Sequence, residues 1–176
     1  MDMPKLLEDL SATVQEMLMK LDAPAMTLSL NYPLPTLERL LGAALSQEEM
    51  LEALEKGFAG VQDRYGLITA RDAGEGLLCL TVPAKGAAYM LAHGAGADFL
   101  RDLLGAVKGH ASMQDVMAVF EKHGRAHAEK MDNPEFDYLV YFEDGQPDSF
   151  RYCLSQHGGH VSYHRFAKED YESFGF

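Results

Sequence analysis

Hydrophobic residues recur with two different periods along this chain, and each period predicts a different kind of element. Apolar residues return every three or four positions between Leu6 and Leu21, which predicts an amphipathic helix. A weaker alternation over 26–32 predicts a strand, and the segments 67–70 and 77–82 flank a loop rich in Gly and Asp, as the strands of a hairpin do. Helical spacings predict further helices over 46–65, 84–92, 98–108 and 112–132, with short helical turns at 36–41 and 168–173.

A two-residue period marks the C-terminal part of the chain and predicts three antiparallel strands. The strands are Phe136–Glu143, Ser149–His157 and His160–Phe166. Gly158-Gly159 has the composition of a two-residue type I′ turn. That turn places His157 opposite His160 and Cys153 opposite His164.

The pairing of the first two of these strands depends on the loop between them. A five-residue loop over 144–148 places Phe142 opposite Phe150, so that the aromatic residues of both strands share one face. A two-residue turn at Asp144-Gly145 would shift the pairing by one residue and separate those aromatics. We therefore expect the five-residue loop.

Alternate side chains of a strand share a face, so the three strands divide into an apolar and a polar set. The apolar set is Phe136, Tyr138, Val140, Phe142, Phe150, Tyr152, Leu154, Val161 and Tyr163. The polar set is Asp137, Leu139, Tyr141, Glu143, Arg151, Cys153, Ser155, His157, His160, Ser162 and His164. Burial of each large apolar side chain contributes roughly 1.5–3 kcal/mol, so we expect helices to pack on the apolar face.

The order of elements predicts an α+β fold. Successive strands joined by short turns pair antiparallel. We expect an antiparallel sheet, consisting of the C-terminal three-stranded meander and the central hairpin, with several helices packed on one face. The chain has 176 residues, a length typical of one domain, and no linker or repeat interrupts it, so we expect a single domain over 1–176.

Charge and composition narrow the classes of function. The net charge is −12, and the 15 basic residues are scattered along the chain, which disfavours nucleic acids and anionic membranes as partners. No apolar run is long enough to span a membrane, and the N-terminus does not resemble a signal peptide. We therefore expect a cytoplasmic protein whose two cysteines, Cys79 and Cys153, are free thiols.

The polar face carries the candidate ligand-binding residues. They are Asp137, Tyr141, Arg151, Cys153, His157, His160 and His164. Two kinds of chemistry are compatible with this set. The histidines with Asp137 or Cys153 are ligand types for zinc or another transition metal, although the spacing matches no standard ligand pattern. Cys153 opposite His164 could form a nucleophile and base pair, although a structural cysteine is the more frequent role at a strand centre.

Other histidines are interpreted as structural. His123 and His127 lie four residues apart on the predicted helix 112–132, a spacing that can bind a metal ion, but the glutamate of the metalloprotease pattern does not follow His123. Partly buried, hydrogen-bonded side chains are the expected role. His93 and His110 lie beside glycines at helix ends, where a histidine can cap free carbonyl groups.

Four stretches carry a resemblance to a known family. They are Asn31–Gly42 (NYPLPTLERLLG), the helix start Glu48–Leu54, Asn133–Glu143 (NPEFDYLVYFE) and His160–Phe176 (HVSYHRFAKEDYESFGF). These segments resemble a small family of uncharacterised bacterial proteins, described as a domain of unknown function. The resemblance spans nearly the whole chain and implies a stand-alone domain of this length, without an activity or catalytic residues.

No catalytic motif stands out, so we expect a non-enzymatic binding or interaction module. Its partner is then a small ligand or a protein, which includes a second copy of the chain in a homodimer. We expect no cofactor and no bound metal ion. The alternative is a metal- or thiol-dependent enzyme that uses Cys153, His157, His160 and His164 on the polar sheet face.

Overall fold

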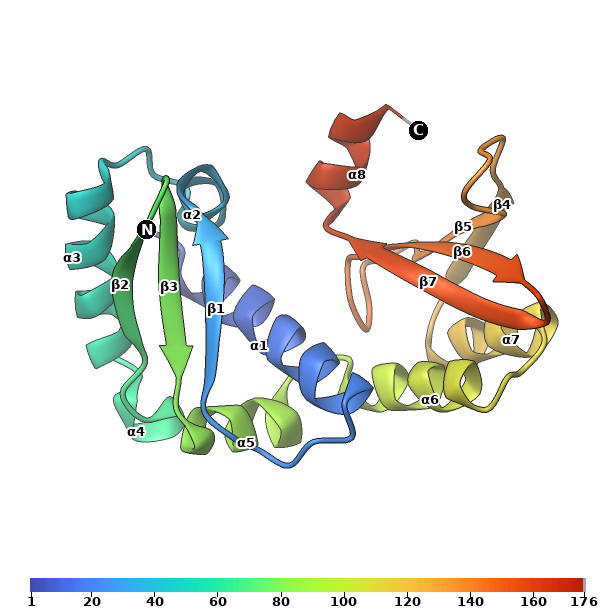
Figure 1. Ribbon diagram of the computed structural model, residues 1–176, viewed down its shortest axis with the longest axis horizontal. Coiled ribbons are helices and arrows are strands. Elements are labelled where there is room, and N and C mark those ends of the chain that lie inside the picture. The colour runs from blue at the N-terminus through green and yellow to red at the C-terminus, as the bar shows by residue number, and fades with distance from the viewer. Residues whose placement is uncertain (176) are drawn as a thin grey trace. The chain divides into compact units, whose positions relative to one another are not determined.

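A computed structural model describes residues 1–175, and the chain divides into two compact units (Figure 1). The first unit comprises Met1–Ala97 and the second begins at Asp98. Phe176, the last residue of the segment that resembles the uncharacterised family, lies outside the described residues. Each unit has its own antiparallel sheet, so the fold is α+β, as predicted. The prediction of a single domain over 1–176 stays a prediction.

The first unit contains a three-stranded sheet with the order β1-β3-β2. Its elements are α1 (Met3–Lys20), β1 (Leu28–Pro33), α2 (Leu34–Leu41), α3 (Gln47–Ala59), α4 (Gln62–Tyr65), β2 (Thr69–Gly74), β3 (Leu77–Val82) and α5 (Ala84–His93). The predicted hairpin β2–β3 is present, and the predicted N-terminal strand pairs antiparallel with β3, where Leu30 faces Leu80. The prediction of one sheet that joins the hairpin and the C-terminal meander was wrong. The structure has two sheets, because β1 pairs with the hairpin and the meander belongs to the other sheet.

Helix ends in this unit follow the local sequence. Ser46 and Glu49 form a capping box at the start of α3, in which each side chain accepts a hydrogen bond from the other residue's backbone N–H. The helix predicted over 46–65 is interrupted at Gly60, and α4 follows as a separate single turn. Glycine is a poor helix former, which explains the interruption.

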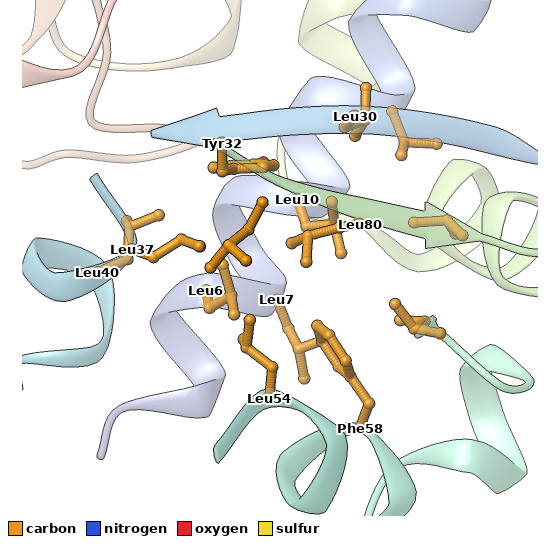
Figure 2. Close-up of a cluster of buried hydrophobic side chains, with 14 of the residues drawn as sticks. Leu6, Leu7, Leu10, Leu30, Tyr32, Leu37, Leu40, Leu54, Phe58 and Leu80 are labelled. Carbon is orange, nitrogen blue, oxygen red and sulfur yellow. The ribbon is translucent and has the colours of Figure 1, made fainter. Parts of the chain in front are cut away.

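The core of the first unit lies between its sheet and three helices. Figure 2 shows leucines of α1 and α2 and the Leu54 and Phe58 side chains of α3 meeting Leu30, Tyr32 and Leu80 of the sheet. The Tyr32 hydroxyl donates a 2.9 Å hydrogen bond to Asp9 of α1, and burial together with the nearby Asp9 carboxylate raises the pKa of this phenol. This polar contact fixes β1 against α1 at the margin of an otherwise apolar core.

The second unit contains a four-stranded sheet with the order β4-β5-β6-β7. Its elements are α6 (Ala97–Lys108), α7 (Met113–His123), β4 (Ala126–Lys130), β5 (Tyr138–Phe142), β6 (Arg151–His157), β7 (His160–Phe166) and α8 (Lys168–Phe174). Within this unit, α7 lies on one side of the sheet and α8 on the other (Figure 1). The two helices therefore cover opposite faces.

The predicted pairing of the C-terminal strands is confirmed. His157 faces His160 and Cys153 faces His164 across β6 and β7. Leu139 faces Cys153 across β5 and β6, which is the pairing that the five-residue loop requires. Gly158 and Gly159 both have positive φ, as a type I′ turn demands.

The prediction of one helix over 112–132 was wrong, because α7 ends at His123 and a fourth strand follows. Gly124 has an extended backbone, and a Cβ atom at this position would lie 2.7 Å from the ring of Phe142. The chain therefore needs glycine where it turns from α7 into β4. His127 lies on β4, so the helical i,i+4 relationship with His123 does not exist.

We call the face of this sheet that carries Val140, Phe142, Tyr152 and Leu154 the inner face, and all four side chains are buried. Phe99 of α6 and Phe120 of α7 cover it. The Phe99 ring lies 5.0 Å from both Phe120 and Phe142, and Phe120 lies 5.2 Å from Tyr152. The expected packing of helices on the apolar face is therefore present.

Phe136 does not lie on the inner face, contrary to the prediction. It precedes β5, and the Asn133 side chain accepts hydrogen bonds from the backbone N–H groups of Glu135 and Phe136. This Asx turn ends the two-residue alternation before the strand begins. Phe136 packs instead with Leu139 and Cys153 on the opposite side of the sheet.

Among residues 1–175, no helix is both long enough and apolar enough to cross a lipid bilayer.

Candidate functional site

The candidate residues belong to the face of the four-stranded sheet opposite to α6 and α7, which we call the outer face. Alternation along β5, β6 and β7 places Tyr141, Arg151, Cys153, His160 and His164 on it. This face is only partly covered. A small group of side chains, which we call the outer cluster, lies against α8, while the histidines of β7 are exposed.

The outer cluster forms a second apolar core. Its buried members are Phe136, Leu139 and Cys153, and its partly buried members are Met131, Tyr141, Phe166 and Tyr171. Tyr171 comes from α8, whose Phe174 ring also contacts the Phe166 ring at 5.4 Å. The face predicted to be polar therefore has an apolar part that the C-terminal helix covers.

Cys153 is fully buried in this cluster. Burial raises the pKa of its thiol to about 11, so the protonated form dominates at neutral pH. His164 is the cross-strand neighbour of Cys153 but remains exposed, with its ring 5.5 Å from the Phe136 ring. Neither the burial of the thiol nor the position of the imidazole favours a thiolate nucleophile.

Arg151 and Tyr141 form the polar centre of the outer face. The Arg151 guanidinium carbon lies 4.0 Å from the centre of the Tyr141 ring, a cation–π contact. The His127 ring lies 5.1 Å from the same tyrosine ring, and Phe166 is the cross-strand neighbour of Arg151. The half-buried positive charge therefore stacks on one aromatic ring, that of Tyr141, which in turn contacts the His127 ring.

The guanidinium of Arg151 has few polar contacts. Within residues 1–175 it forms no ion pair, and its hydrogen bond to the Ser149 carbonyl oxygen is long at 3.5 Å. The nearby acid, Glu129, is instead 3.2 Å from the His127 imidazole. Much of the hydrogen-bonding capacity of this guanidinium is therefore available to a ligand.

Tyr171 lies at the edge of this centre. Burial, and then the nearby Cys153 and Glu129, raise the pKa of its phenol, while Arg151 acts in the opposite direction. The same side chain therefore both covers the thiol and approaches the guanidinium.

Asp137 has a structural role in this geometry. Its carboxylate accepts a 2.8 Å hydrogen bond from the backbone N–H of Gln156, while its own N–H donates to the Leu154 carbonyl oxygen. The aspartate thereby extends the pairing with β6 to the residue before the start of β5. It is not grouped with the histidines as a metal ligand.

The three histidines of the candidate set are exposed and do not converge on one point. His157 and His160 flank the β6–β7 turn, and His164 lies further along β7. His160 instead contacts His110, which follows α6. Among the described residues, no group of three or more His, Cys, Asp or Glu side chains is arranged to hold a metal ion.

Three residues of the outer face or its rim were not predicted as site residues. The sequence pattern places His127 on a predicted helix, Tyr171 on a short helical turn and His110 at a helix end. Gly124, as a helix-ending residue, could have located β4 and hence His127. The contacts of Tyr171 and His110 join distant parts of the sequence, which no local pattern reveals.

The comparison with family models assigns the chain to one family. The model described as "Domain of unknown function, E. rectale Gene description (DUF3877)" matches residues 3–175. The chain belongs to the DUF3877 family. The predicted resemblance to an uncharacterised bacterial domain is thereby confirmed. No curated protein and no solved structure matches the chain.

Proposed function

We propose that this DUF3877 protein is a binding module whose ligand carries a carboxylate group and docks on the outer face of the four-stranded sheet. The observation that carries the proposal is the Arg151 guanidinium, which lies over the Tyr141 ring at 4.0 Å and has no ion-pair partner within residues 1–175. Arginine presents paired N–H groups that match a carboxylate with two parallel hydrogen bonds.

The surroundings of Arg151 favour a ligand that is partly apolar. The guanidinium lies over the Tyr141 ring, and both Tyr141 and Phe166, the cross-strand neighbour of Arg151, pack against the outer cluster. Ligand sites in proteins combine such apolar walls with a few fixed polar groups. A carboxylate next to an aromatic or aliphatic group, as in a peptide C-terminus or a small organic acid, fits both features.

The net charge restricts the ligand further. At −12, the protein repels extended polyanions, so a single carboxylate recognised by one arginine is more compatible than a nucleic acid. We also propose the cytoplasm as the location, since Cys79 and Cys153 are both free and buried. A homodimer through the outer face is the competing form of this proposal.

The enzymatic alternative has less support. A nucleophilic cysteine requires an accessible thiolate, whereas Cys153 is buried and its pKa is raised to about 11. His157, His160 and His164 are exposed along the hairpin and are not gathered around Cys153. No observation on the outer face favours catalysis over binding.

Isothermal titration calorimetry with a matched pair of probes tests the proposed function. The probes are the tripeptide Ala-Ala-Phe with a free C-terminus and the same peptide as its C-terminal amide. We expect saturable binding of the free acid, and a loss of about tenfold or more in affinity for the amide, because one charge-assisted hydrogen-bond pair contributes about 1.5–3 kcal/mol.

Two variants localise the binding. Arg151→Gln should weaken binding of the free acid to the level of the amide. Arg101→Gln, which removes an exposed arginine paired with Asp98 on α6, should leave it unchanged. Equal binding of acid and amide, or an unchanged affinity in Arg151→Gln, would contradict a carboxylate site at Arg151. Concentration-dependent sedimentation of the protein without peptide would instead favour the homodimer.

A further inference from the structure

Two histidines from distant parts of the second unit meet at the tip of the β6–β7 hairpin. The Nδ1 atoms of His110 and His160 lie 2.6 Å apart, and their ring centres are 4.3 Å apart with planes at 74°. His110 follows α6, and His160 is the first residue of β7. Both side chains are exposed to solvent.

The backbone at His110 has a conformation that is uncommon for residues other than glycine. Its φ is +57°, in the left-handed region that favours glycine, and the N–H groups of His110 and Ala111 satisfy carbonyl groups of the last turn of α6. Glycine is the usual residue at such a helix end, and Gly109 immediately precedes it. Histidine adopts this conformation more often than most residues other than glycine, and here it brings the His110 imidazole against His160.

The position of His160 is fixed by the turn before it. Gly158 and Gly159 have φ values of +58° and +82°, and the strand pairing that follows sets His160 directly opposite His157. Residues that face each other across an antiparallel pair have Cβ atoms about 4.5–5.5 Å apart. His157 is therefore the cross-strand neighbour of His160 on the hairpin.

The two facing nitrogen atoms define a particular chemistry. Each Nδ1 is a donor or an acceptor according to its tautomer, so the neutral pair can hold only one proton between the two rings. When that proton moves to Nε2 of its own ring, both imidazoles stay neutral and both Nδ1 lone pairs can bind one metal ion. Imidazole nitrogen suits zinc, copper and nickel, whereas magnesium and calcium require oxygen ligands.

We propose that His110 and His160 form a transition-metal site, selective for Zn²⁺, Cu²⁺ or Ni²⁺. Tetrahedral zinc with Zn–N distances of 2.0–2.1 Å separates two ligand atoms by about 3.3 Å, so the exposed rings must move apart by only several tenths of an ångström. Water fills the remaining coordination positions. The site is independent of the proposed carboxylate site at Arg151.

The bound ion would join the α6–α7 connection to the β6–β7 hairpin. A ligand that binds only the folded protein stabilises it in proportion to the logarithm of its concentration over its Kd. We therefore expect Zn²⁺ to raise the melting temperature of the wild-type protein.

Titration of the full-length, tag-free, metal-stripped protein with ZnCl₂ in a calorimeter tests the site. We expect one ion per chain in the wild type. His110→Gly should keep the left-handed backbone while removing the imidazole, and His160→Gln should keep a polar side chain at the start of β7. Both should weaken zinc binding by about tenfold or more, which corresponds to about 1.4 kcal/mol.

The control is His93→Gln, because His93 is an exposed histidine on α5 whose Nδ1 lies 3.2 Å from the Tyr89 carbonyl oxygen of the same helix. It should bind zinc like the wild type, and circular dichroism should show all variants folded. Absence of saturable binding up to about 1 mM zinc, or binding by His110→Gly and His160→Gln equal to that of the wild type, would overturn the proposal.

Discussion

The two faces of the four-stranded sheet are made from alternate residues of the same strands, yet helices cover them to different extents. The inner face is closed by Phe99 and Phe120 from two helices of the same unit. The outer face is closed only over Cys153 and its neighbours, where the seven-residue helix α8 supplies Tyr171. Beyond that patch, the arginine and histidine side chains remain accessible.

This difference separates a structural role from a binding role. A fully buried aromatic face presents no polar group to a ligand, and the close packing of its side chains stabilises the fold. The outer face retains a guanidinium without an ion pair in the described part of the chain, stacked on the Tyr141 ring. Substitutions on the inner face should therefore lower stability, and substitutions on the outer face should mainly weaken ligand binding.

The largest expected effect comes from two neighbouring aromatic residues that point to opposite faces. Phe142 is buried on the inner face, and Phe142→Ala should lower the free energy of unfolding by about 3–5 kcal/mol. Tyr141 is half-buried on the outer face, and Tyr141→Ala should lower it by roughly 1 kcal/mol. Urea denaturation measures both, and equal effects would mean that the two faces are equally important for folding.

A polar atom placed at Cys153 tests how well α8 closes the outer cluster. Cys153→Ser should lower the free energy of unfolding by about 1–3 kcal/mol, because a buried hydroxyl without a hydrogen-bond partner is more unfavourable than a buried thiol. Cys153→Ala should be less destabilising than Cys153→Ser in the same urea experiment. If serine is tolerated as well as alanine, water reaches this position and the cluster is open.

The pH dependence of stability gives a second test of the same burial. The thiol of the unfolded chain ionises near pH 9, whereas the folded pKa is raised to about 11 by burial. The unfolded state therefore loses its proton first, and the free energy of unfolding should fall as the pH rises from about 9 to about 11. Buried tyrosines contribute in the same direction, so the difference between wild type and Cys153→Ala isolates the thiol. Parallel curves for the two proteins would contradict a raised pKa.

The smallest expected effect on stability comes from removing the cover. Tyr171→Ala should cost only about 1 kcal/mol, because the residue is partly buried and lies on a short helix. It should nevertheless increase the rate at which iodoacetamide labels Cys153 in the native protein. Cys79, buried on β3 of the other unit, is the internal control. An unchanged Cys153 rate would show that residues other than Tyr171 shield the thiol.

Strand pairing was largely predictable from the sequence. The Gly158-Gly159 turn fixes the opposition of Cys153 and His164, and the alternation of aromatics selects the pairing of β5 with β6. The turn and the alternation are both local features of the sequence. Because side chains alternate between faces every second residue, only one register keeps the aromatic residues on one face.

The wrong predictions for Phe136 and for the segment of β4 have local causes that the spacing of apolar residues does not show. Phe136 continues the alternation in sequence but precedes the strand, because the Asn133 side chain turns the backbone there. The segment of β4 contains alanine, glutamate and lysine, which are good helix formers, and it becomes a strand through pairing with β5.

The composition of the candidate site was predictable only in part. The sequence places Arg151 and Cys153 on the same face. The cation–π contact of Arg151 and the burial of Cys153, however, depend on neighbours from other elements. His110 and His160 are 50 residues apart, and their contact arises from the turn after α6. Such contacts belong to tertiary packing and leave no spacing pattern in the sequence.

The most direct test of the contrast between the faces is a methyl and arginine side-chain NMR titration with Ala-Ala-Phe that has a free C-terminus. Leu139 is the reporter of the outer face, and Val140 and Leu154 report the inner face of the same strands. We predict saturable shifts of the Leu139 methyl groups and of the Arg151 Nε–H signal, with Val140 and Leu154 unaffected. Shifts centred on Val140 and Leu154, or no shift of the Arg151 signal at saturating peptide, would contradict recognition on the outer face.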